Sequence, residues 1–297
     1  ELETCPFALL ACLVTPMALP SCCLRPPLLA AVGAPSAAAL AAAGRRGPSL
    51  ALARARRAVS TLQGPSGELL VHAEGQSRAA GSVVFAHGLG DSPAGWHWQA
   101  ASWSHELPWL RFALPNAPMQ PVTLNGGMLM PAWYDVHGLG DRLQEPADGA
   151  ESSREIWIDL LEAEASQVGG RDRVVLGGFS QGGAMALYTA LQLNMLPLVA
   201  GVLCMSGYLP NHAAVAAALP PGRRPLALAE LPVLLCHGKS DPMVSIDSAR
   251  RTRDALEELG MRNVVLREYD NMGHEVCEFE LDDVVEWLRA TLPPPLL

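Results

Sequence analysis

From residue 68 onward, short apolar runs alternate with longer segments whose apolar residues recur every three or four positions. The short runs predict β-strands and the periodic segments predict helices. In segment 152–168, for example, Ile156, Leu160 and Ala163 fall on one helical face. The expected strands are 69–73, 82–86, 110–114, 173–176, 198–205, 232–236 and 263–269, and the expected helices are 152–168, 181–193, 245–259 and 278–291.

This alternation favours a mostly parallel central sheet with helices on both faces. The strand around Val174 to Leu176 is apolar throughout, as is typical of a strand that is buried on both sides. Residues 115–149 are rich in Pro, Gly and Met and predict one long loop. No repeat or second change of composition divides this part, so we expect a single α/β domain over residues 67–297.

Residues 1–66 differ in composition from the rest of the chain. They are rich in Ala and Arg, and no acidic residue occurs between Glu3 and Glu68. This composition is typical of an organelle transit peptide. The apolar segment 5–24 contains three prolines, which makes a permanent membrane-spanning helix doubtful, although it could be the signal part of a two-part leader. The alternative is a disordered or untranslated extension with no targeting role.

The overall composition narrows the class of protein. A net charge of −9 argues against a general nucleic-acid binder, and 49% hydrophobic residues allow a large core. Beyond residue 66 the only cysteines are Cys204, Cys236 and Cys277, whose spacing matches neither a disulfide framework nor a metal site.

Residues 178–182 read Gly-Phe-Ser-Gln-Gly and match the G-x-S-x-G pattern of a nucleophile at a sharp bend. The pattern requires a buried strand before it and a helix after it, and both are predicted here. Such a bend leaves room only for small neighbours, which Gly178 and Gly182 provide. We therefore expect Ser180 to be a catalytic nucleophile at the carboxyl end of the sheet.

A serine hydroxyl needs a base to take its proton, and on this kind of sheet the chain order is Ser, acid, His. His274 follows the last predicted strand and is the expected base. Asp241, in the loop after strand 232–236, is the expected orienting acid, and Asp270 is its strongest rival. His237 lies directly at a strand end, and no catalytic role is needed to explain it.

The Gly-flanked turn 87–91 follows strand 82–86 and can direct a backbone N–H towards the same edge. We expect the amides of Leu89 and Gln181 to form a two-donor oxyanion hole. His87 and Asp91 lack a third ligand at the spacing of a zinc site, and the third glycine of a dinucleotide fingerprint is missing. We expect no metal and no organic cofactor.

With these motifs, the sequence resembles the acyl-protein thioesterase / lysophospholipase family, the carboxylesterase type of α/β-hydrolase. The segments that carry the resemblance are 85–91, 115–118, 122–125, 130–135, 176–183 and 237–242. The resemblance implies an α/β-hydrolase fold and places the family's catalytic residues on Ser180, Asp241 and His274, with its oxyanion donors on Leu89 and Gln181. A departure is that Glu275 and Val276 follow His274 in place of small hydroxyl residues.

The resemblance implies hydrolysis of long-chain acyl thioesters on palmitoylated protein cysteines. A general carboxylesterase or lysophospholipase is the alternative, since these reactions share the catalytic parts, and an inactive lipid-binding homologue is a third hypothesis. The partners are therefore S-acylated proteins or lysophospholipid and ester substrates, with no nucleic acid and at most peripheral membrane contact. The resemblance implies a cytoplasmic location, and a plastid or mitochondrion is the alternative if 1–66 is a transit peptide. The sequence does not indicate an oligomeric state.

The apolar residues clustered in 124–133 are too many for a free surface. We expect Leu124, Met130 and Trp133 to form a flexible wall for an acyl chain, since Met and Leu adapt to irregular shapes. Packing against the sheet edge is the alternative. The tryptophans at 96, 98 and 103 are interpreted as core or rim.

Overall fold

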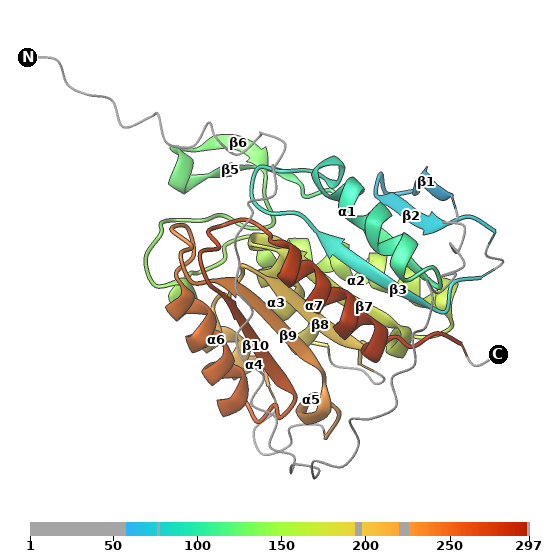
Figure 1. Cartoon of the computed structure of the whole chain (residues 1–297). Coiled ribbons are helices and arrows are strands. Elements are labelled where there is room, and N and C mark those ends of the chain that lie inside the picture. Colours follow the sequence, from blue (N-terminus) through green and yellow to red (C-terminus); the bar gives the residue numbers. More distant parts are fainter. Residues whose placement is uncertain (1–57, 76–77, 194–197, 220–225, 296–297) are drawn as a thin grey trace, which may run out of the picture.

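The computed structural model describes residues 58–75, 78–193, 198–219 and 226–295, so nearly all of the predicted leader lies outside the described residues. An eight-stranded sheet in the order β1-β2-β4-β3-β7-β8-β9-β10 forms its centre (Figure 1). Its strands are β1 (Val59–Gln63), β2 (Leu69–Ala73), β3 (Gly81–Ala86), β4 (Leu110–Leu114), β7 (Val174–Phe179), β8 (Gly201–Met205), β9 (Val233–Gly238) and β10 (Val264–Tyr269).

Six strands, from β4 through β3 and β7 to β10, run parallel. β2 pairs antiparallel with β4, and β1 pairs antiparallel with β2 at the edge. The helices are α1 (Pro93–Glu106), α2 (Ala150–Val168), α3 (Gln181–Leu191), α4 (His212–Ala218), α5 (Leu226–Glu230), α6 (Ile246–Glu258) and α7 (Glu278–Thr291). The expected mostly parallel α/β sheet is confirmed.

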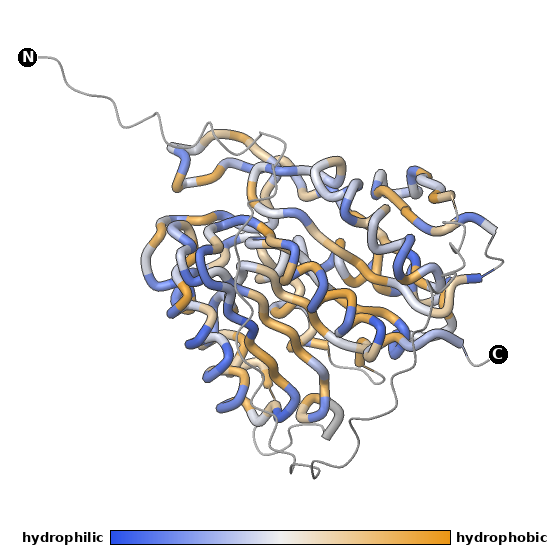
Figure 2. The backbone as a smooth tube through the Cα atoms, in the orientation of Figure 1, coloured by the Kyte–Doolittle hydropathy of each residue, from blue (hydrophilic) through white to orange (hydrophobic). Residues whose placement is uncertain are grey.

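The helices cover both faces of this sheet. The core on one face includes residues of α1 and α7, and the core on the other face includes residues of α2, α3 and α6 (Figure 1). Every residue of β3, β8 and β9 is buried, and Figure 2 shows these strands as predominantly hydrophobic while α6 is mostly hydrophilic. Burial on both sides explains why these central strands are predominantly apolar and do not alternate.

Three strands, β1, β5 and β6, lie where the sequence did not predict them. Within the predicted loop 115–149, β5 (Met119–Val122) and β6 (Met128–Pro131) pair as a separate antiparallel hairpin, joined by a short 3₁₀ turn at Thr123–Asn125. These strands have four residues each, too few for a period to be visible, and β5 contains Pro121. β1 lies inside the segment 1–66, so the sheet begins before the expected domain start.

Helix α1 was also missed, because its apolar side chains form no clear stripe along the sequence. Trp96 and Trp103 are buried and stack on Phe85 of β3 with ring centroids 4.7 and 5.2 Å away. Trp98 is 49% exposed. Two of the three tryptophans therefore belong to the core, and the third lies on the rim.

Candidate active site

Ser180 lies at a sharp bend between β7 and α3. Its backbone has φ 53° and ψ −119°, a conformation that is costly for a residue with a side chain. A Cβ on Gly178 would collide with the backbone of Gly182, and a Cβ on Gly182 would collide with Ala86 of β3. The two glycines of the motif therefore allow the bend to pack closely enough to hold Ser180 in this conformation.

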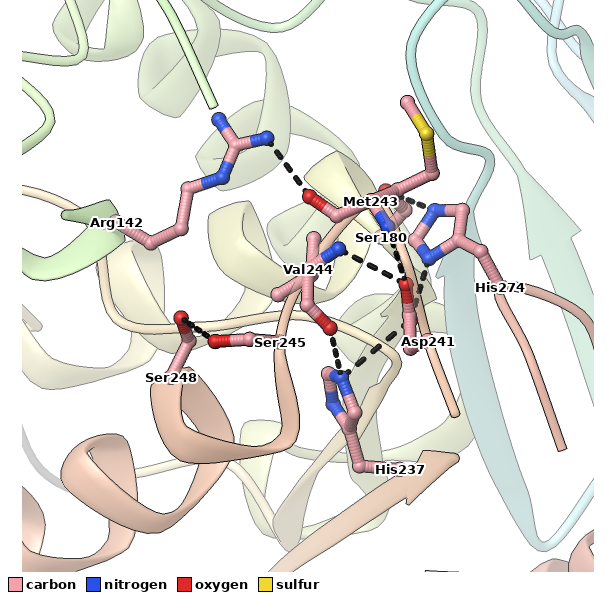
Figure 3. Close-up of polar contacts among 9 residues, drawn as sticks. All are labelled: Arg142, Ser180, His237, Asp241, Met243, Val244, Ser245, Ser248 and His274. Carbon is pink, nitrogen blue, oxygen red and sulfur yellow. Dashed lines mark hydrogen bonds and ion pairs between the residues drawn. The ribbon is translucent and has the colours of Figure 1, made fainter. Parts of the chain in front are cut away.

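Three side chains meet beyond the ends of three different strands (Figure 3). His274 Nε2 lies 2.9 Å from the hydroxyl oxygen of Ser180, and His274 Nδ1 lies 2.7 Å from Asp241 Oδ2. Because an ionised carboxylate can only accept hydrogen bonds, Nδ1 carries the proton and Nε2 is free to accept the serine proton. The structure thus brings together the serine, base and acid that the sequence singled out.

The carboxylate of Asp241 is fully buried. Its Oδ1 accepts the backbone N–H groups of Met243 and Val244 at 2.8 and 2.9 Å, and its Oδ2 accepts from His274 and lies 3.4 Å from His237 Nε2. Burial acts to raise the pKa of Asp241, but the hydrogen bonds from His237 and His274 outweigh it and hold this pKa well below its usual range. Asp241 is therefore an anion at neutral pH.

The rival acid, Asp270, has a different partner. Its carboxylate forms an ion pair with the ammonium group of Lys239 at 2.8 Å, and its side chain is about half exposed. Asp247 and Asp254 on α6 likewise pair with arginines of that helix. The geometry therefore favours Asp241 over Asp270 as the partner of His274.

The two expected oxyanion donors lie on either side of Ser180. Leu89 is in the turn after β3, and a Cβ on the neighbouring Gly88 would lie 3.2 Å from Cβ of Ser180. Gln181 is the first residue of α3, where a backbone N–H has no acceptor within the helix. Within the described part of the chain, neither the Leu89 nor the Gln181 amide has a hydrogen-bond acceptor. Both are available to bind an oxyanion.

The side chain of Gln181 has a second role that the sequence did not reveal. Its Oε1 accepts the N–H of Trp133 at 2.8 Å, and its Nε2 donates to the carbonyl of Tyr134 at 2.7 Å. These bonds tie the segment after β6 to the helix that follows Ser180. Nothing in the motif predicts them, because the partners are almost fifty residues apart in the sequence.

Trp133 requires a correction to the predicted acyl wall. Its side chain is fully buried, and its Nε1 donates to the carbonyl of His87 at 2.9 Å. A buried indole cannot line an open surface, so Trp133 is not part of the acyl wall. Its hydrogen bond to His87 stabilises the turn 87–91 instead. Burial also lowers the pKa of His87, whose Nε2 accepts the N–H of Ala117. His87 is thus also part of the packing of this turn.

Leu124 and Met130 are placed differently from Trp133. Both are partly buried and pack against the core, and Met130 Sδ would lie 3.9 Å from a Cβ placed on Gly90, next to Leu89. On the same hairpin Met119, Met128 and Leu129 are 60–64% exposed. The β5–β6 hairpin therefore presents an apolar, adaptable surface beside the expected oxyanion donors.

The described residues form neither a metal-binding cluster nor a membrane-spanning helix. Among those residues, no three His, Cys, Asp or Glu side chains are grouped so that they could hold a metal ion. The helices in the described ranges are all too short or too polar to span a bilayer.

Comparisons with known proteins indicate the family of this chain. The sequence profile described as phospholipase/carboxylesterase matches residues 69–292. Acyl-protein thioesterase 1 of Neurospora crassa is 37% identical over 73% of this chain and 89% of its own length, and that of Mycosarcoma maydis is 38% identical over 76% and 97%. The crystal structure of Zea mays acyl-protein thioesterase 2 has a TM-score of 0.66 at 32% identity, covering 75% of this chain and 97% of that one. With its α/β-hydrolase fold, the chain belongs to the phospholipase/carboxylesterase family of hydrolases.

Proposed function

We propose that the protein hydrolyses acyl esters and thioesters with Ser180 as nucleophile, His274 as general base and acid, and Asp241 as orienting acid. The observation that carries this proposal is the continuous hydrogen-bonded chain from Ser180 through His274 to Asp241. Removing one member of such a chain lowers activity far more than substituting an exposed residue does.

The residues act in two stages. Ser180 Oγ attacks the carbonyl carbon while its proton passes to His274 Nε2, and the amides of Leu89 and Gln181 bind the oxyanion. His274 then protonates the leaving thiolate or alkoxide, which departs and leaves the acyl group on Ser180. In the second stage His274 removes a proton from water, the resulting hydroxide attacks the acyl carbon, and His274 returns the proton to Ser180 Oγ as the carboxylic acid leaves. Asp241 stabilises the imidazolium in both stages.

We infer that the substrates are long-chain acyl groups linked through thioesters to protein cysteines. The relatives are named acyl-protein thioesterases, which supports this substrate class. The apolar side chains Leu124 and Met130 beside the oxyanion donors suit an acyl chain. The family description as phospholipase and carboxylesterase supports lysophospholipids or simple esters as the alternative substrates. We propose a cytoplasmic location, with a plastid or mitochondrion as the alternative if residues 1–66 are a transit peptide.

The test uses Ser180→Ala. We expect turnover of an S-palmitoyl peptide, of lysophosphatidylcholine and of a p-nitrophenyl ester to fall by roughly 10⁴-fold or more, and labelling by a fluorophosphonate to disappear. Ser166→Ala, on the exposed side of α2, is the matched control that retains activity. Turnover retained by Ser180→Ala would defeat the proposed mechanism. Faster turnover of lysophosphatidylcholine than of the S-palmitoyl peptide by the unmodified enzyme would favour the alternative substrate.

A further inference from the structure

The acid loop, residues 241–245, determines where the Asp241 carboxylate points. It connects β9 to α6 and turns back on itself, so that the N–H groups of Met243 and Val244 both donate to Oδ1 of Asp241 at 2.8 and 2.9 Å. The other oxygen, Oδ2, is the one that accepts from His274. The direction of the carboxylate therefore depends on the orientation of two peptide groups in this loop.

Arg142 reaches this loop from a distant segment. It lies in the 3₁₀ turn η2 (Arg142–Gln144), and its Nη2 donates to the carbonyl of Met243 at 3.2 Å, while its Nη1 donates to Gly138 at 2.8 Å. Only 6% of the side chain is exposed, and its guanidinium lies 5.2 Å from the ring centroid of Tyr208 and 3.5 Å from the Glu145 carboxylate. Figure 3 shows the arginine pointing at the outer side of the acid loop.

The contact of Arg142 with the Met243 carbonyl affects Asp241, because two of the bonded atoms belong to the same peptide group. The carbonyl of Met243 and the N–H of Val244 belong to one planar amide. The guanidinium binds the oxygen of this amide, and the Asp241 carboxylate accepts from its nitrogen. A cation at the oxygen polarises the amide, strengthens its N–H as a donor and fixes the plane in which it points.

The next amide of the loop is held from the opposite side. His237 Nε2 donates to the carbonyl of Val244 at 2.7 Å and lies 3.4 Å from Asp241 Oδ2. The imidazole is almost fully buried, at the end of β9. The acid loop is thus held between a fixed strand end on one side and the guanidinium of Arg142 on the other (Figure 3).

We propose that Arg142 is a positioning residue for catalysis, which acts on His274 through the Met243–Val244 peptide and the Asp241 carboxylate. The proposal rests on the proposed function, since it concerns the orienting acid of that reaction. Arg142 does not touch the reacting atoms. Its loss should lower kcat and leave KM nearly unchanged, because the base loses its orientation while the surfaces that bind substrate stay in place.

The obvious alternative is that Arg142 only anchors the segment around η2. The same segment has a second anchor, the ion pair of 2.9 Å between Asp141 and Arg251 of α6. Among the described residues, Arg251 forms no hydrogen bond or ion pair with the acid loop. Arg251→Met is therefore a matched control that removes an arginine from the same segment without disturbing the Met243 carbonyl. Simple anchoring predicts similar effects for the two arginines, and the proposal predicts different ones.

The experiment measures kcat and KM on a p-nitrophenyl ester, with kcat expressed per site labelled by a fluorophosphonate, so that unfolded protein is not counted. Because Arg142→Met alone would leave the Glu145 carboxylate buried without its cation, the test variant is Arg142→Met combined with Glu145→Gln, compared with Glu145→Gln alone. We expect kcat per labelled site to fall by about 10–100-fold, as for a catalytic group misplaced from a distance, with KM nearly unchanged. We expect Arg251→Met to stay within about twofold of the unmodified enzyme, the scatter of independent sites.

Two results would overturn the proposal: a double variant within about twofold of Glu145→Gln alone, or an equal loss in Arg251→Met. If the double variant does not fold, Arg142→Lys decides, because one ammonium cannot hold the Gly138 and Met243 carbonyls as the planar fork does. A loss of at least about threefold in that variant supports the proposal, and unchanged kcat overturns it. Failure of the proposed function is recognised separately, since the unmodified enzyme would then fail to label at Ser180.

Discussion

Asp241 and Asp270 are chemically identical carboxylates, both near the ends of the last two strands, yet their surroundings give them opposite expected roles. Asp241 is buried and directed at His274, whereas Asp270 is half exposed and paired with Lys239. A buried anion with fixed donors can hold an imidazole in one tautomer, but an exposed ion pair in water contributes little. Environment and not residue type therefore distinguishes the two.

We expect Asp241→Asn to lower kcat by roughly 10⁴-fold, because an amide that donates to Nδ1 stabilises the wrong tautomer of His274. Asp270→Asn should change kcat by less than about twofold, since it breaks only an exposed pair. Steady-state kinetics on one ester substrate tests both variants. A large loss in Asp270→Asn with activity retained in Asp241→Asn would transfer the role of the acid.

The elements around the site differ in how well the sequence predicts them. The bend between β7 and α3 was predicted, because the two glycines and the apolar strand that dictate it are local to Ser180. The β5–β6 hairpin was not predicted, since the placement of this region depends on distant contacts such as that of Gln181 with Trp133. No local pattern predicts the contact of Arg142 either, because its partner Met243 is 101 residues away.

Gln181→Met tests how far the segment after β6 depends on the amide side chain of Gln181. The variant keeps the length of the side chain and the backbone N–H but leaves the Trp133 N–H and the Tyr134 carbonyl without partners. Each buried unsatisfied group costs ~1–3 kcal/mol, so we expect the free energy of unfolding to fall by about 2–6 kcal/mol. The free energy of unfolding is measured by urea denaturation.

The control for this prediction is Gln192→Met at the other end of α3. Its side chain donates to Tyr188 one turn earlier and is only partly buried. We expect this variant to stay within about 0.5 kcal/mol of the unmodified protein, as do most surface substitutions. Equal unfolding midpoints for the two variants would show that the Gln181 bonds do not stabilise the segment after β6.

For the chain as a whole, the alternation of apolar strands and helices was enough to predict the sheet, because burial on both faces leaves a continuous apolar signature in strands such as β3 and β9. The same core also contains charged residues that no pattern predicts. Glu280, in the first turn of α7, has an exposed fraction of 0%. Its location depends on how α7 packs on β9 and β10, and this packing is a property of the assembled domain.

Glu280 makes the stability of the protein depend on pH. Burial raises the pKa of its carboxyl well above the usual value, and the nearby charge of Asp283 adds to this effect. The folded state therefore holds a proton that the unfolded chain releases near pH 4.5. The stability linked to this proton is complete below that pH and is lost as pH rises towards the raised pKa, by up to about 1.4 kcal/mol per unit.

Glu280→Gln removes this titration while keeping the shape of the side chain. Relative to the unmodified protein, we expect the variant to gain stability as the pH rises above 4.5, as measured by urea midpoints at each pH. Contributions of the other carboxyl groups cancel in the difference, because they are the same in both proteins. Glu278→Gln, in the same turn but exposed, is the control for the substitution itself, and its free energy of unfolding should stay within about 0.5 kcal/mol of that of the unmodified protein. A difference for Glu280→Gln that does not change with pH would mean that the Glu280 carboxyl is ionised inside the folded protein, at a cost in free energy that its neighbours would have to offset.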